Sequence, residues 1–235
     1  MSLIICVYVE EGIVLASDSR TSYNKLNENI NFIGVHSTNT TNKTFLCPNN
    51  SGISTCGDAS IQGKPISGYI ESFIREKITS DTNIENMPKL IKDYFKKLES
   101  NLNTVFIIAG YKKENEKYTQ KIYRIRTNIE KIETIDTTAG QGALWDGEIL
   151  TLTKLLTPVY NKDNQTGEFK PFPVPEFAWN YYTLQDAIDF AKYGIKTTMD
   201  TMRFQTVPET VGGPIDILVI KPEAAKWLSK KELKG

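Results

Sequence analysis

The first 60 residues alternate between short apolar, β-branched runs and polar turns, a pattern that predicts paired strands. A Glu10-Glu11-Gly12 turn separates the first two runs, and Pro48-Asn49-Asn50 separates the next two. Between these hairpins, residues 21–42 are rich in Asn, Ser and Thr, so we expect an irregular loop there. The expected strands cover residues 3–9, 13–16, 43–47 and 51–56.

The rest of the chain combines helical and extended patterns. Pro65 and Pro88 stand at the starts of two apolar stripes with helical spacing, where a missing N–H does no harm. Thr183 with Asp186 opens a further stripe, and the Lys-rich residues 221–235 are expected to form a solvated face. The expected helices begin near residues 65, 88 and 183, with a fourth over 143–156, and strands are expected over 104–109, 122–125 and 215–220.

This order of elements fits sheets layered against pairs of helices. The sequence shows neither an internal repeat nor a linker, so we expect a single domain over residues 1–235. Phe169 to Tyr182 contains six aromatic residues and three prolines, which suit neither a helix nor a central strand. Two interpretations of this segment stay open: an ordered surface loop, or a contact between subunits.

The amino-acid composition excludes several classes of protein and of functional site. The chain has 235 residues with 28 Lys and Arg against 28 Asp and Glu, and this balance argues against a general nucleic-acid binder. The single histidine, His36, excludes sites that need several imidazoles and is itself expected in a solvated loop. Cys6, Cys47 and Cys56 form no CxxC pair and suit buried thiols of a reducing compartment. There is no long apolar run and no secretory signal, so we expect a cytoplasmic protein without a membrane span.

Several blocks carry a family resemblance. Gly12 to Arg20 resembles the first hairpin of proteasome β-subunits and their bacterial relatives, which are N-terminal-nucleophile hydrolases. Counting back from Asp18, the family's nucleophile position falls on Ser2 without a gap. The resemblance implies an α+β fold arranged as a four-layer αββα sandwich. Further matching blocks are Lys43 to Cys47, Ser54 to Gly57, Ala187 to Asp200, Gly212-Gly213 and Ile215 to Ile220.

The resemblance implies a catalytic role for Ser2 once Met1 is removed. Ser2 then carries a hydroxyl nucleophile and a free α-amine that acts as its base. An α-amine titrates at about 7.7–8.0, so no histidine is required. Lys43 would favour the deprotonated amine and stabilise charge on the hydroxyl oxygen, while Asp18 would hold Lys43.

Five further residues receive roles by the same resemblance. Gly57 is expected to offer its backbone N–H to the oxyanion, and Thr55 and Arg20 are expected at the substrate. Asp200 is assigned as the carboxylate that orients the amine, with Glu209 as its competitor. The alternative for Arg20 is a surface ion pair with Asp18.

The chain also departs from the family pattern. Its nucleophile would be Ser in place of Thr. The family's Gly-Ser-Gly is matched here by Gly140-Gln141-Gly142, so a supporting serine would be replaced by Gln141. The Asp-x-x-Ser that usually precedes the double glycine is replaced by Asp-Thr-Met-Arg at residues 200–203.

The expected function is a self-compartmentalising peptidase that acts on peptides or unfolded proteins and assembles into a homo-oligomeric ring or helical array. An unfolding ATPase is the partner that such a family member implies, although no residue pattern specifies one. No metal or organic cofactor is implied. Two alternatives stay open: a catalytically silent assembly subunit, and a small-molecule amide hydrolase on the same fold.

Overall fold

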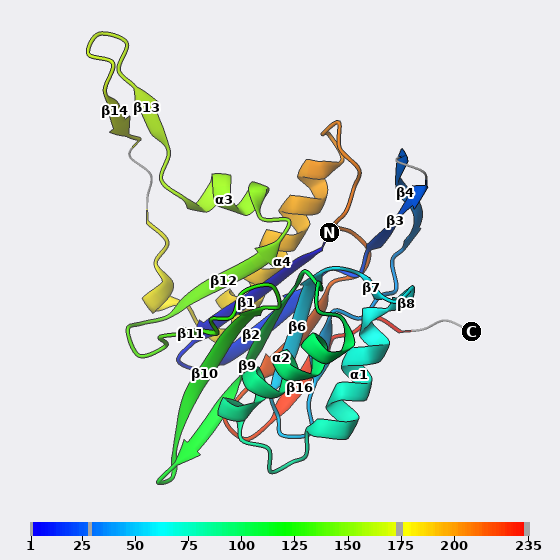
Figure 1. Ribbon diagram of the computed structural model, residues 1–235. Helices are drawn as coiled ribbons and strands as arrows, with labels where there is room; N and C mark the ends of the chain where they lie inside the picture. Colours follow the sequence, from blue (N-terminus) through cyan, green and yellow to red (C-terminus); the bar gives the residue numbers. More distant parts are fainter. Residues whose placement is uncertain (1, 28–29, 173–175, 233–235) are drawn as a thin grey trace.

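Two five-stranded antiparallel sheets form the centre of the computed structural model, which describes residues 2–27, 30–172 and 176–232 (Figure 1). The first sheet has the strand order β12-β1-β2-β15-β16 and the second has the order β11-β10-β9-β6-β5. The strands of the first sheet are β1 (Leu3–Val9), β2 (Gly12–Ser17), β12 (Gly142–Gly147), β15 (Asp216–Ile220) and β16 (Ala225–Ser229). Those of the second are β5 (Thr44–Leu46), β6 (Gly52–Gly57), β9 (Thr104–Glu114), β10 (Lys117–Arg126) and β11 (Glu133–Ile135).

Helices cover one face of each sheet (Figure 1). The amphipathic helices α1 (Ile66–Lys77) and α2 (Met87–Leu98) pack on the second sheet through a cluster that includes Phe73, Phe95 and Phe106. The helices α3 (Leu150–Leu156) and α4 (Leu184–Met202) pack on the first sheet. A third cluster, which contains Leu15 and Ile107, fills the space between the two sheets. The prediction of a mixed fold with sheets packed against helix pairs is therefore confirmed.

The first hairpin lies at the centre of this arrangement. Both faces of β1 and β2 are covered, by α4 on one side and by the second sheet on the other. A strand that is buried on both faces needs apolar residues at consecutive positions, which explains the unbroken runs in the sequence. The register pairs Ile4 with Ser17, so the start of β1 and the end of β2 lie side by side.

The helix α4 begins as the sequence predicts. The Thr183 hydroxyl accepts a hydrogen bond from the Asp186 backbone N–H, and the Asp186 carboxylate accepts one from the Thr183 backbone N–H. This capping box satisfies two N–H groups that the first helical turn leaves without partners.

The structure corrects the expected loop over residues 21–42. These residues contain a hairpin of β3 (Thr21–Asn27) and β4 (Ile30–Thr38), and His36 lies in β4, stacked on the Tyr23 ring at 6.0 Å. The Asn, Ser and Thr content is misleading here, because the interleaved Ile, Phe, Tyr and Val residues have a strong preference for strands.

Two other expectations are wrong in part. Residues 143–156 are helical only from Leu150, because residues 142–147 pair with β1 as an edge strand. The Lys-rich residues after 220 are not simply a solvated face, because 225–229 pair with β15 as strand β16. Residues 142–147 find their partner in β1, which lies far away in the sequence, whereas 225–229 form a hairpin with the preceding strand β15.

The segment between α3 and α4 contains a projecting hairpin, β13 (Tyr160–Lys162) and β14 (Phe169–Pro171), which we call the arm (Figure 1). After the arm, the Trp179 ring packs against Phe190 of α4 at 4.9 Å. Residues 173–175 of the aromatic segment lie outside the described part. Smaller elements are β7 (Ser60–Ile61), β8 (Lys64–Pro65), η1 (Ile84–Asn86) and η2 (Trp179–Tyr181).

Within the described residues, none of the helices combines the length and the apolar character needed to cross a membrane.

Candidate active site

Ser2 lies immediately before β1 and is almost fully buried. Its backbone carbonyl accepts a hydrogen bond from the Glu148 N–H at 2.8 Å. Gly147 packs directly against the same carbonyl: a Cβ at position 147 would lie 1.9 Å from the Ser2 oxygen. Gly147 also has a φ of +101°, in the region that favours glycine. The end of β12 therefore fixes the position of Ser2.

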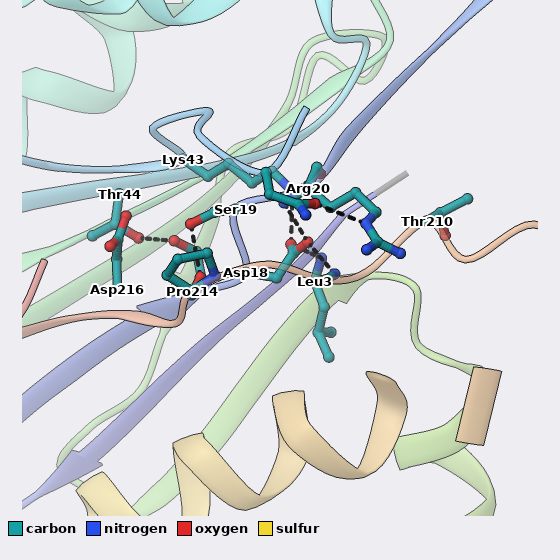
Figure 2. Close-up of polar contacts among 12 residues, drawn as sticks. Leu3, Asp18, Ser19, Arg20, Lys43, Thr44, Thr210, Pro214 and Asp216 are labelled. Carbon is teal, nitrogen blue, oxygen red and sulfur yellow. Dashed lines mark hydrogen bonds and ion pairs between the residues drawn. The ribbon is translucent and has the colours of Figure 1, made fainter. Parts of the chain in front are cut away.

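Asp18 follows β2 and is fully buried, with both carboxylate oxygens used (Figure 2). Oδ1 accepts hydrogen bonds from the Leu3 backbone N–H at 3.0 Å and from the Lys43 ammonium at 2.7 Å. Oδ2 accepts from the backbone N–H groups of Arg20 and Gly212, at 3.1 and 3.0 Å. One carboxylate thus joins the first hairpin, Lys43 and the loop before β15.

Lys43 is buried in an ion pair with Asp18, and its side chain is 3% exposed. The ammonium also donates a hydrogen bond to the Arg20 backbone carbonyl. Burial lowers the pKa of Lys43, and the Asp18 carboxylate opposes this effect without cancelling it. The structure therefore brings Asp18 and Lys43 together as a buried ion pair, as the resemblance implies.

A small pocket of about 20 Å³ lies at this cluster, and residues from distant segments line it. Ser2, Lys43, Thr55 and Gly57, all singled out from the sequence, are among them. The remaining lining residues are Thr21, Thr41, Asn42, Cys56, Asp58, Ala59 and Ile66.

Two lining residues have unusual local environments. Thr55 Oγ1 is buried and has no hydrogen-bond partner among the described residues. Gly57 has a φ of +114°, and a Cβ there would lie 2.4 Å from the Asn103 carbonyl oxygen. A buried hydroxyl without a partner is costly, so Thr55 is suited to bind a polar group that enters the pocket.

Arg20 and the two candidate carboxylates, Glu209 and Asp200, form ion pairs outside the set of residues that line the pocket. The Arg20 guanidinium pairs with the Glu209 carboxylate at 2.7 Å and with Asn39 Oδ1 at 2.9 Å, so it ties the loop before β15 to the first hairpin. Asp200 is half exposed and pairs with Lys196 one turn earlier in α4. Among the described residues no hydrogen bond links Asp200 to Ser2 or to the Asp18–Lys43 pair, so the structure does not bring it into the cluster.

The structure also corrects the position given to the supporting Gly-Ser-Gly. Gly140-Gln141-Gly142 lies at the far end of β12, where Gly142 pairs with Tyr8. The residues beside Ser2 are Gly147 and Glu148, which sequence reasoning missed. The signal that could have found them is the Asp-Gly-Glu turn just before the short helix α3.

The described residues contain no group of three or more His, Cys, Asp or Glu side chains that could hold a metal ion. Cys6, Cys47 and Cys56 are free and buried, and burial raises the pKa of each thiol, that of Cys47 to about 12. A thiol with a raised pKa is a poor nucleophile. Of these three thiols only that of Cys56 lines the pocket.

The structure is similar to two solved structures of Anbu from Hyphomicrobium sp. strain MC1. An Anbu mutant matches with a TM-score of 0.60 and 16% identity, over 97% of this chain and 87% of that one. A second Anbu structure matches with a TM-score of 0.58 and 16% identity, over 98% and 88% of the two chains. Anbu is a bacterial proteasome-like protein, and at this identity the match shows a shared fold. No family model and no curated protein matches the sequence.

Proposed function

We propose that this chain is a proteasome-like peptidase whose nucleophile is Ser2, exposed at the chain start by removal of Met1. The observation that carries the proposal is the placement of Ser2 in one pocket with Lys43, whose ammonium pairs with the buried Asp18 carboxylate. The shared fold with Anbu supports it. The two sheets with a helical layer on each side would then correspond to the αββα sandwich of such enzymes.

The reaction follows from these groups. The Ser2 hydroxyl attacks the peptide carbonyl carbon, and its proton passes to the neutral α-amine of the same residue. The Gly57 backbone N–H stabilises the oxyanion, and the C–N bond then breaks as the α-amine returns the proton to the leaving amine. Water hydrolyses the resulting ester by the same route and restores the Ser2 hydroxyl. Lys43 favours the neutral α-amine, and Asp18 keeps Lys43 in place.

Covalent labelling tests this proposal. A peptide epoxyketone needs both a hydroxyl and a free α-amine on one residue, so it reports nucleophile and processing together. We expect wild-type protein to lack Met1 and to gain the mass of one inhibitor, mapped to Ser2, and Ser2→Ala to gain none. Retention of Met1 on the native protein would refute the mechanism and favour a silent assembly subunit.

Assembly is a second part of the proposal. The arm and its surroundings expose several large apolar side chains, and an isolated two-stranded hairpin has little stability in water. We propose that these residues form contacts within a homo-oligomeric ring or helical array, with an unfolding ATPase supplying substrate. Native mass spectrometry should show a multimer, whereas a monomer or dimer would favour the small-molecule amide hydrolase. The exposed residues are Leu155, Val159, Tyr160, Phe169 and Phe172.

The pocket predicts a substrate preference that Thr55→Val should alter. Valine has the shape of threonine but lacks the hydroxyl, so the variant should keep or slightly raise its stability, by up to about 1 kcal/mol. Peptides with Ser before the cleaved bond should lose about 10-fold in kcat/KM relative to peptides with Ala, because their hydroxyl loses its partner. Parallel assays of the two peptides on both proteins measure this ratio. An unchanged ratio would show that Thr55 does not contact the substrate.

A further inference from the structure

The segment after β16 brings a lysine into the interior. The Lys231 ammonium forms an ion pair with the Asp216 carboxylate, and the Lys231 backbone N–H donates to Asp216 Oδ1 at 2.8 Å. The two side chains are only 5% and 1% exposed. A buried charge without a partner is strongly destabilising, so each of these groups depends on the other. The neighbouring Lys230 is exposed and lies over the Trp227 ring.

Asp216 lies at the polar end of the core between the two sheets. It begins β15 and pairs in register with Ser17, the last residue of β2. Side chains alternate along a strand, so Asp216 faces the same space as Leu218, and Ser17 faces the same space as Leu15. The apolar core between the sheets therefore ends in polar side chains at this point.

Hydroxyl groups extend this end of the core to the second sheet. The Thr44 hydroxyl donates a hydrogen bond to Ser17 Oγ at 2.9 Å and lies 2.9 Å from Ser54 Oγ. Figure 2 shows Thr44 and Asp216 at the same end of the cluster. We call Ser17, Thr44, Ser54, Asp216 and Lys231 the polar layer. All five side chains are buried or nearly so.

The polar layer is directly continuous with the proposed catalytic pair. Ser17 precedes Asp18 and Thr44 follows Lys43, so one residue of the layer adjoins each member of that pair. The charges also interact: burial lowers the pKa of Lys43 most, and the Lys231 charge lowers it further. Two buried lysines therefore share this region, each compensated by its own aspartate.

We propose that Lys231 is a positioning residue, which completes the polar layer through Asp216 and thereby holds the Asp18–Lys43 pair in place beside Ser2. This inference rests on the proposed function of Ser2. It gives a role in the site to a segment more than 200 positions away from Ser2 in the sequence, outside the set of described residues that line the pocket.

Three variants test the role of Lys231. Lys231→Met removes the cation, and Lys231→Met/Asp216→Asn also removes the carboxylate that would otherwise be left unpaired in the interior. Lys230→Met is the matched control, because it removes a neighbouring lysine that is exposed. The measurements are kcat and KM for a fluorogenic peptide, and hydrogen exchange of the backbone amides over residues 17–20 and 43–44.

We expect both Lys231 variants to lower kcat about 10- to 100-fold with KM nearly unchanged, because the Asp18–Lys43 pair shifts while Thr55 and Gly57 keep their places in the pocket. The same variants should exchange faster over residues 17–20 and 43–44, and Lys230→Met should match the wild type in both measurements. If the double variant regains the wild-type kcat, Lys231 only compensates a charge and the positioning role is overturned.

A failure of the peptidase proposal can be distinguished from a failure of the role proposed for Lys231. If wild-type protein fails to react with the epoxyketone, the peptidase proposal fails, and hydrogen exchange alone then decides the role of Lys231. Faster exchange confined to residues 17–20 and 43–44 in the double variant would uphold it. Exchange equal to that of Lys230→Met would overturn it.

Discussion

Asp18→Asn is expected to lower the free energy of unfolding by about 3–5 kcal/mol, although asparagine has the same shape as aspartate. Asp18 only accepts hydrogen bonds: each carboxylate oxygen accepts two, and all four come from N–H groups. An asparagine must turn its NH₂ group, itself a donor, toward two of these N–H groups. Lys43 also loses the negative charge that compensates for its burial. Urea denaturation of the variant and the wild type measures the loss.

Lys43→Met is the matched comparison for this prediction. It leaves the Asp18 carboxylate three backbone N–H donors and removes an ammonium that is costly to bury, so the loss should be smaller, about 1–2 kcal/mol. Both variants should also lose the proposed peptidase activity. A larger loss of stability in Lys43→Met than in Asp18→Asn would show that the ion pair, and not the set of N–H donors, dominates the stability of this cluster.

Gly147→Ala is expected to be the most disruptive single methyl addition near Ser2. The new Cβ would overlap the Ser2 carbonyl oxygen, and a φ of +101° is unfavourable for alanine, so we expect a loss of about 3–5 kcal/mol. The strand start must shift to relieve the overlap, and a displacement of about 1 Å should lower the rate of Ser2 labelling about 100-fold. Thermal unfolding and the rate of epoxyketone labelling check the two effects.

Gly167→Ala provides the control for backbone strain alone. Gly167 has a φ of +74° in the arm and no atom within 4 Å of an added Cβ. Its loss of stability should therefore stay near 1–2 kcal/mol, roughly the cost of a left-handed alanine, with the labelling rate unchanged. Equal losses in the two variants would mean that strain, and not the contact with Ser2, explains the requirement for Gly147.

The sequence is most informative where local pattern and short-range pairing decide the structure. The first hairpin has a two-residue turn and two unbroken apolar runs, so its register is set locally, and that register returns Asp18 to the start of β1. The block from Lys43 to Gly57 is a second hairpin, in which residues 47–51 join β5 to β6. Each hairpin thus sets the spacing within itself, whereas the joint reading of Ser2, Asp18, Lys43 and Gly57 came from the family resemblance.

Prediction fails where the partner of a segment lies far away in the sequence. Gly147 and Glu148 reach Ser2 only because β12 pairs with β1, and the glycine of an apparently better motif, Gly142, lies at the other end of that strand. The role predicted for Asp200 rests on the family resemblance of residues 187–200. Its exposed pairing with Lys196 depends instead on how α4 lies on the sheet, which helical periodicity does not specify.

The sequence by itself thus indicated the two hairpins that carry the catalytic candidates and most of the helices and strands around them, and the family resemblance led to the proposal of a base at the chain start in place of a histidine. Only the tertiary structure showed three further features: the β12 end against Ser2, a Thr55 hydroxyl with no hydrogen-bond partner among the described residues, and the buried Lys231 beside Asp216. The physical reason is that burial and long-range pairing depend on the packed fold. A lysine in a Lys-rich segment is indistinguishable from its neighbours until the fold places a buried carboxylate beside it.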